Sequence, residues 1–270
     1  MRWENLTAPD FVQAVRDVQG VCLLPIGVIE KHGEHLPMGT DYFRGQALAD
    51  AVAQIEPAIV FPPYYFGQVQ EARHQPGAIA LSPQLLFNLL EEVCGEIARN
   101  GLNKIVIISA HGGNRFFLPH FARSMLYKRK DFIVYLPDTT IYRPYKTDEW
   151  KKIKQEESDG HAGEVESSEI LYIHPELAKM DSFGGDGSAR PRLGALSEMF
   201  TGIQWYAEYP DHYCGDGRTA TAEKGKFIME WSSQRLAKLV RAVKADNVLP
   251  KLAAEYYDQA EKPLDTPRKL

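Results

Sequence analysis

The feature that most constrains this sequence is a set of short apolar runs separated by helical patterns. Residues 104–110 (KIVIISA) form the clearest run, and residues 21–26 form a second one. Runs of this length without polar alternation are typical of strands buried on both faces of a sheet. Helical patterns over residues 41–55 and 85–98 stand near them. Strands that alternate with helices predict an α/β fold with a mostly parallel sheet covered on both faces.

Composition narrows the class of protein further. The 270 residues include 44% hydrophobic ones and carry a net charge of −5, which argues against a nucleic-acid partner. No apolar stretch is long enough for a bilayer span, the N-terminus lacks a secretory pattern, and three scattered cysteines suit a reducing compartment. We therefore expect a cytoplasmic protein with one domain over residues 1–250 and a C-terminal extension over 251–270.

The loop after the first predicted strand is dense in potential metal ligands. It reads GVIEKHGEHLPMGTD and carries Glu30, His32, His35 and Asp41. Parallel sheets bind their ligands at the carboxyl ends of strands, where this loop begins. Nitrogen and carboxylate ligands without a thiolate favour zinc, manganese or iron. The alternative is a polar loop whose histidines only form hydrogen bonds.

Two further segments carry histidines. His111 ends the strongest predicted strand and is followed by two glycines and Asn114, so it either faces the ligand crevice or caps the next helix. His161 and Glu164 stand one helical turn apart in DGHAGEVESS, where Glu166 follows. Acidic residues in a first helical turn are also favourable without any catalytic role, and that explanation stays open.

Taken together, these three segments resemble the creatininase (creatinine amidohydrolase) family. GVIEKHGEHLPMGTD resembles the first metal loop of the family, AHGGN its histidine turn and HAGEVESS its third element. The stretch from CGDGR to AEKG resembles the C-terminal part, so the resemblance covers about residues 20–226. It implies a three-layer α/β/α sandwich, two divalent metals per subunit and commonly a homohexamer.

The resemblance also assigns metal ligands by position. It implies one metal on Glu30, Asp41 and His111, and a second metal on His32 and Asp41, so that Asp41 bridges the two. The family has a glutamate two residues after the turn histidine, but this chain has a glycine at that position, Gly113. Glu166 is our candidate for the ligand that this glycine cannot supply.

The remaining roles concern catalysis and substrate. His161 matches the catalytic histidine of the family, suited to protonate a leaving group, and Glu164 is expected beside it. We expect substrate contacts from Asn114, Arg73, Tyr213 and Arg218. The last two lie in an irregular segment, residues 180–220, that predicts a lid or a partner surface; its polar and aromatic residues include Tyr206, Tyr209 and His212. No tryptophan stands near His161 in the sequence, so we expect a pocket unlike the one for creatinine.

These residues predict a hydrolase in which metal-activated water attacks a carbonyl of a small polar cyclic substrate. The preferred reaction is cleavage of a C–N bond in a cyclic amide or formamide. The alternative is cleavage of a C–C bond in a cyclic diketone derived from an oxidised inositol. A third hypothesis is a non-catalytic polyol-binding module that keeps the fold and binds no metal tightly.

Overall fold

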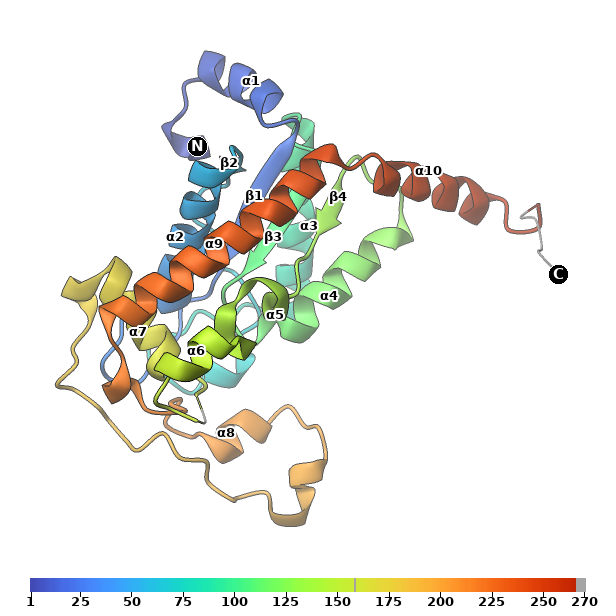
Figure 1. Cartoon of the computed structure of the whole chain (residues 1–270). Coiled ribbons are helices and arrows are strands. Elements are labelled where there is room, and N and C mark those ends of the chain that lie inside the picture. The colour runs from blue at the N-terminus through green and yellow to red at the C-terminus, as the bar shows by residue number, and fades with distance from the viewer. Residues whose placement is uncertain (158, 266–270) are drawn as a thin grey trace.

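The computed structural model describes residues 1–157 and 159–265 and contains a four-stranded sheet in which every strand is parallel (Figure 1). The strand order is β2-β1-β3-β4. The strands are β1 (Val21–Ile26), β2 (Ile59–Val60), β3 (Lys104–Ser109) and β4 (Ile133–Tyr135). β1 pairs with β3 over its whole length. The predicted α/β fold is therefore confirmed, and each predicted apolar run contains the observed strand.

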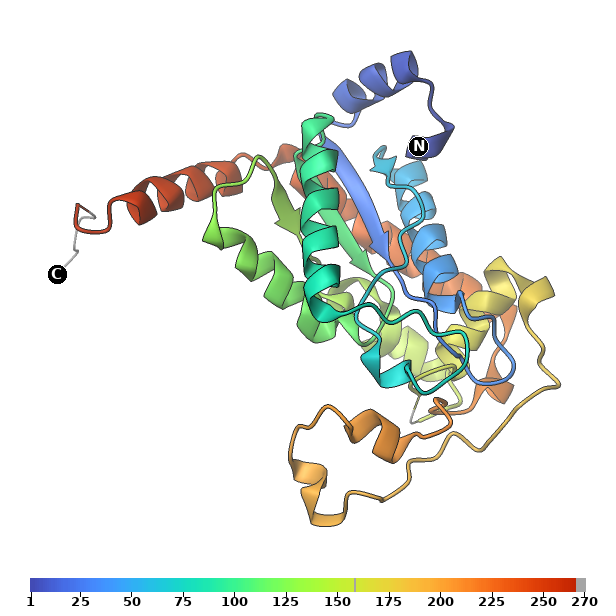
Figure 2. The same cartoon turned by 180° about the vertical axis from the view of Figure 1, so that it is seen from behind.

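The sheet is covered on both faces, which explains why its strands are apolar throughout. Cys22, Leu24 and Ile26 of β1 face one core, whereas Val21 and Leu23 face the other. Helices on the first face are α1 (Ala8–Asp17), α3 (Pro83–Arg99) and α4 (Asn114–Ser124). Those on the second face are α2 (Thr40–Ile55), α5 (Thr139–Tyr142) and α9 (Ala222–Ala245). Figures 1 and 2 show the two helical layers from opposite sides.

The other elements surround this three-layer body. The remaining α-helices are α6 (Asp148–Ile153), α7 (Glu164–Ile173), α8 (Gln204–Glu208) and α10 (Val248–Glu261). The 3₁₀ helices are η1 (Trp3–Asn5), η2 (Gln70–Ala72), η3 (Met125–Tyr127), η4 (Pro144–Lys146), η5 (Pro175–Leu177), η6 (Gly194–Glu198) and η7 (Gly217–Thr219). None of the described helices is long and apolar enough to span a bilayer.

Two segments extend from the body. Residues 178–216, which include η6 and α8, form a long excursion beyond the carboxyl ends of the strands (Figure 1). The helix α10 buries none of its residues and projects at the opposite end of the molecule (Figure 2). The predicted extension from residue 251 falls largely within α10, and residues 266–270 lie outside the described part of the chain.

The contact between α7 and α9 depends on a glycine, and its substitution gives a test of the fold. A Cβ at Gly225 of α9 would lie 1.9 Å from the carbonyl oxygen of Ser168 in α7. We expect Gly225→Ala to lower the free energy of unfolding by about 1–3 kcal/mol, because overpacked positions must shift the backbone. Urea unfolding followed by circular dichroism measures this change.

Gly95→Ala in α3 is the matched control, because among the described residues no atom outside the helix's own backbone and the chain neighbours lies within 4 Å of a Cβ built there. Alanine favours a helix interior over glycine, so this variant should gain up to about 1 kcal/mol. Equal changes in the free energy of unfolding of the two variants would show that α7 and α9 are not in close contact at Gly225.

Candidate metal centre

The predicted ligands meet where the order of the sheet reverses. From β1 the chain proceeds to β2 on one side, and β3 then lies on the other side of β1. The loops that leave β1 and β3 therefore lie side by side at the position where such sheets usually bind their ligands. Glu30 and His32 follow β1, and His111 follows β3. A Cβ at Gly27 would lie 2.5 Å from the backbone nitrogen of Tyr42, so glycine lets the end of β1 approach the first turn of α2.

The first ligand cluster consists of Glu30, Asp41 and His111. His111 Nδ1 lies 2.9 Å from Glu30 Oε1 and 2.9 Å from Asp41 Oδ2. All three residues are buried, and neither oxygen has a hydrogen bond of good geometry within the described structure. Buried polar atoms normally have a partner, whereas metal ligands direct their lone pairs at a common point. The three side chains thus fit a divalent cation.

The second cluster shares Asp41 with the first one. His32 Nε2 lies 3.3 Å from Asp41 Oδ1 and 3.6 Å from Glu166 Oε2. Within the described residues His32 Nε2 has no hydrogen-bond partner, whereas His32 Nδ1 lies 3.2 Å from the carbonyl oxygen of Glu30. Since a carbonyl only accepts, the neutral form of the His32 ring keeps its proton on Nδ1, and its Nε2 lone pair then faces the cluster. The two oxygens of Asp41 therefore face two different groups of ligands.

The electrostatics of the centre favour positive charge. Burial opposes the protonated form of His32, but the carboxylates of Asp41, Glu166 and Glu30 outweigh it and raise the pKa of His32 to about 9. Burial likewise opposes protonation of His111, but Glu30 and Asp41 raise its pKa well above the ordinary value. A site that draws protons onto two buried imidazoles is one that attracts cations.

His161 brings a third imidazole to the centre. Its Nε2 lies 2.7 Å from the carbonyl oxygen of Lys31, so Nε2 carries the proton and Nδ1 carries the lone pair. Nδ1 lies 4.0 Å from Glu30 Oε1 and 3.9 Å from Glu166 Oε2. Burial, together with the neighbouring charge of His32, lowers the pKa of His161 to about 4. The lone pair on Nδ1 is thus available for a proton or a metal.

Residues 4–240 match the family model named Creatininase, described as creatinine amidohydrolase. The chain belongs to the creatininase family. It is 30% identical over 215 residues to a mycofactocin precursor peptide peptidase from Mycobacterium ulcerans, covering 76% of this chain and 78% of the relative. A 3-dehydro-scyllo-inosose hydrolase from Thermotoga maritima is 26% identical, with coverage of 82% and 76%. A crystal structure of a putative creatinine amidohydrolase from Bacteroides fragilis superposes with a TM-score of 0.73, at 27% identity and coverage of 85% and 91%.

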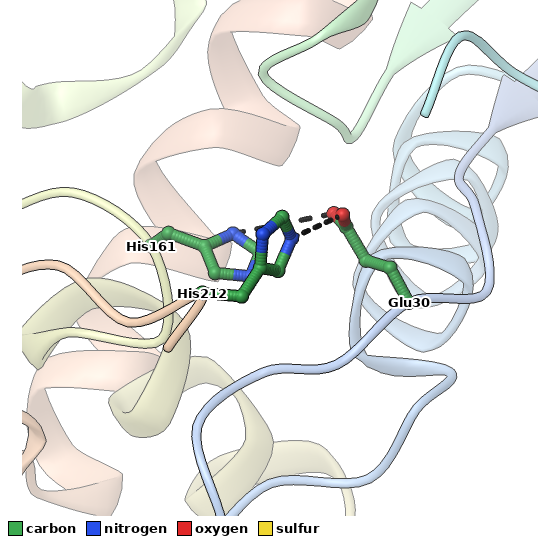
Figure 3. A group of neighbouring side chains, drawn as sticks. All are labelled: Glu30, His161 and His212. Carbon is green, nitrogen blue, oxygen red and sulfur yellow. Dashed lines mark hydrogen bonds and ion pairs between the residues drawn. The ribbon is translucent and has the colours of Figure 1, made fainter. Parts of the chain in front are cut away.

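One buried residue at this centre, His212, is predicted from the sequence only as part of a lid. Its Nε2 lies 2.7 Å from Glu30 Oε2, although 182 positions separate the two residues in the chain. Figure 3 shows His212 and His161 side by side, with Glu30 opposite both. His212 lies in an irregular segment without periodicity, so nothing in its local sequence indicates this position.

Glu164 lies outside both ligand clusters. Its carboxylate accepts hydrogen bonds from the backbone nitrogens of Gln155 and Glu156, at 2.9–3.0 Å, and pairs with Lys224. These contacts fasten the chain before α7 to the start of α9. None of these described hydrogen bonds and ion pairs joins Glu164 to His161, so the catalytic role of Glu164 stays a prediction. Glu166, by contrast, lies close to His32 and His161.

The four residues predicted to bind substrate are dispersed. The Asn114 side chain bonds to backbone groups, donating to Ile26 O at 3.5 Å and accepting from Gln68 N at 3.1 Å. Arg73 is exposed. The Tyr213 hydroxyl accepts from Gly217 N, and the guanidinium of Arg218 lies over the Phe183 ring. The structure thus does not gather these four side chains into one pocket, and their contact with substrate stays a prediction.

Two residues that the sequence did not single out also border the centre. A Cβ at Gly113 would lie 2.5 Å from Glu71 Oε1, so Glu71 fills the space above this glycine. Its carboxylate lies 3.8 Å from His111 Nε2. Although no tryptophan is near His161 in the sequence, the Trp205 ring centroid lies 5.9 Å from that of His161. Both come from segments distant in the sequence.

Asp41→Ala tests the shared ligand. Because the two oxygens of Asp41 face both clusters, we expect this variant to lose bound metal from both, as measured by inductively coupled plasma mass spectrometry of protein purified without chelator. Asp50→Ala is the control, since Asp50 lies on the same helix and pairs with Arg2 near the surface. An Asp41→Ala protein with unchanged metal content would remove Asp41 from the ligand set.

Proposed function

We propose that this chain is a metal-dependent hydrolase that cleaves a C–N bond in a small polar amide. The observation that carries this proposal is the position of Asp41, which offers one oxygen to each of two buried ligand clusters. Glu30, Asp41 and His111 would hold one divalent ion, and His32, Asp41 and Glu166 would hold the other. When bound, such ions polarise a substrate carbonyl and acidify water.

His161 is suited to move the proton of the reaction. Its Nε2–H is bound to the Lys31 carbonyl, which fixes the ring and directs the Nδ1 lone pair into the centre. An imidazole whose pKa is lowered to about 4 accepts a proton only transiently. Nδ1 can therefore take a proton from the attacking water and return it to the departing nitrogen.

Glu166 and Asp41 are held by a buried guanidinium. Arg44 donates to Glu166 Oε1 and lies 3.4 Å from Asp41 Oδ1, while its other face pairs with Glu169. This arrangement leaves Glu166 Oε2 directed at His32. The carboxylates of the centre are thus positioned before any substrate arrives, as electrostatic preorganisation requires.

The enclosure of the centre favours a small substrate. Only 12% of the His161 side chain and 13% of the Glu166 side chain are exposed, and the ligands of the first cluster are more buried still. A cyclic amide or formamide is small enough for such an enclosed centre. A peptide could reach it only with one of its termini. The family description and the peptidase relative both name proteins that act on C–N bonds, which supports the preferred reaction.

C–C bond cleavage in an oxidised inositol is the second candidate. The Thermotoga relative is named for hydrolysis of a keto-inositol derivative and matches 82% of this chain. Cleavage of a β-diketone needs the same water activation and a proton donor to the leaving carbon, so the centre serves either reaction.

A substrate panel distinguishes these functions. Purified protein is loaded with Zn²⁺ or Mn²⁺ and offered cyclic ureides, formamides, short peptides and keto-inositols. Release of ammonia or an amine supports C–N cleavage, and a new carboxylate without nitrogen supports C–C cleavage. Absence of turnover on the whole panel, combined with no bound metal, would instead favour a polyol-binding module.

His161→Ala separates a proton-transfer role from a ligand role. We expect metal content near that of the wild type and a rate lowered by about 10²–10⁴-fold, the usual loss for an acid–base group. Metal analysis measures the bound metal, and steady-state kinetics on the substrate identified by the panel measures the rate. His174→Ala is the control, because this histidine follows α7 and 40% of its side chain is exposed. If His161→Ala empties the centre, His161 is a ligand.

A further inference from the structure

The segment of residues 178–216, named here the lid segment, delivers two side chains to the centre. Figures 1 and 2 show this segment crossing beyond the carboxyl ends of the strands. Its Trp205 lies on α8, and its His212 is only 1% exposed. The lid segment is tied to the body where Gln75 Nε2 donates to Pro210 O at 3.0 Å. It therefore reaches the ligands in a defined position.

The hydrogen bonds of His212 determine where its proton lies. Trp205 Nε1–H donates to His212 Nδ1 at 2.9 Å. An indole nitrogen can only donate, so Nδ1 must present its lone pair and the ring proton must be on Nε2. Nε2–H then donates to Glu30 Oε2 at 2.7 Å. Both ring nitrogens are engaged, which leaves His212 no lone pair for a metal.

This arrangement assigns different tasks to the two oxygens of Glu30. His212 binds Oε2, whereas Oε1 faces His111 Nδ1 at 2.9 Å and has no hydrogen bond of good geometry in the described structure. Histidine ligands and carboxylate ligands of metals are commonly oriented by such outer hydrogen bonds. We propose that Trp205 and His212 are positioning residues, through which the lid segment orients Glu30 for the metal. The proposal rests on the metal centre proposed above.

The backbone of His212 supports this reading. Its φ of +55° lies in the left-handed region, which costs free energy for any residue other than glycine. Its side-chain bonds to Trp205 and Glu30 offset that cost and hold the turn in place. Ring contacts add to this, because the centroid of His212 lies 4.4 Å from that of His161. Lid position and ligand orientation are thus coupled through one residue.

Trp205→Phe tests the relay, because it keeps an aromatic ring and removes only the donor. With the donor gone, the His212 proton is no longer confined to Nε2 and the bond to Glu30 weakens. We expect Zn²⁺ affinity, measured by competition with a chromophoric chelator, to fall by about 10-fold, the lower end for losses of outer hydrogen bonds. Trp231→Phe in α9 is the matched control and should keep the wild-type affinity.

Two substitutions of His212 separate hydrogen bonding from packing. His212→Ala removes the donor to Glu30 and should weaken Zn²⁺ binding by about 10–100-fold. His212→Gln places an amide nitrogen where Nε2 lies and should restore a large part of that loss. Equal losses in the alanine and glutamine variants would show that His212 acts only by filling space.

A double-mutant cycle tests whether Trp205 acts through His212. In the His212→Ala background, Trp205→Phe should produce no further loss of affinity, because the relay is already broken. An effect that persists in that background would assign Trp205 an independent structural role and overturn the relay.

The tautomer can be observed without metal. In ¹⁵N-labelled, chelator-treated protein, long-range ¹H–¹⁵N correlation spectra should show His212 protonated on Nε2, and the Trp205→Phe variant should lose that preference. His212→Ala identifies the resonances. Wild-type protein that binds no Zn²⁺ would refute the metal centre itself, whereas wild-type binding with an unchanged affinity in Trp205→Phe would refute only the relay.

Discussion

The structure of this site depends on the burial of several carboxylates within a few ångströms of one another. Glu30 and Asp41 are almost inaccessible to solvent, and Glu166 lies close to them. Burying a carboxylate is costly unless positive charge or hydrogen bonds compensate it. Arg44 compensates part of this charge, but it also serves the buried Glu169. The remaining demand for positive charge is met by protons on imidazoles or by divalent ions.

Around the centre, other buried carboxylates are compensated by ion pairs with arginine and lysine side chains. Glu169 is bound by Arg143 as well as by Arg44, and Glu164 is bound by Lys224 of α9. Removing one member of a buried pair leaves an uncompensated charge, so these contacts fix how α2, α7 and α9 pack. The candidate ligands on α2 and α7 therefore lie on elements whose relative position is set by these ion pairs and needs no metal. Such support is what a precise metal site requires.

Local patterns in the sequence predict the sheet, and they also predict candidate ligands, because Glu30, His32 and His111 follow apolar runs. The structure brings these residues together, and their binding of a metal stays a prediction. For α7 the sequence predicts roles at the centre for both Glu164 and Glu166, and the structure brings only Glu166 close to the other candidate ligands. The helix begins at Glu164. Each residue of an α-helix is rotated by about 100° from the one before, so Glu164 and Glu166 point to nearly opposite sides and cannot both face the centre. The positions of His212 and Glu71 at the centre were not predictable, since long-range packing alone brings irregular segments to the crevice.

The exchange of side chains around Gly113 bears on the choice of substrate. Gly113 has no side chain, and the space that a longer residue would fill at this position is occupied by Glu71. Glu71 reaches this space from η2, and 19% of its side chain is exposed. A carboxylate at the edge of the centre attracts N–H groups and repels the oxygen-rich face of a diketone. For the proposed hydrolase, the Glu71 carboxylate would favour substrates that present an amide nitrogen beside the carbonyl under attack. The family resemblance places a glutamate at the end of the strand, where this chain has Gly113, whereas the negative charge here is carried by Glu71 on a separate segment. The charge at the edge of the centre therefore depends on how that segment packs.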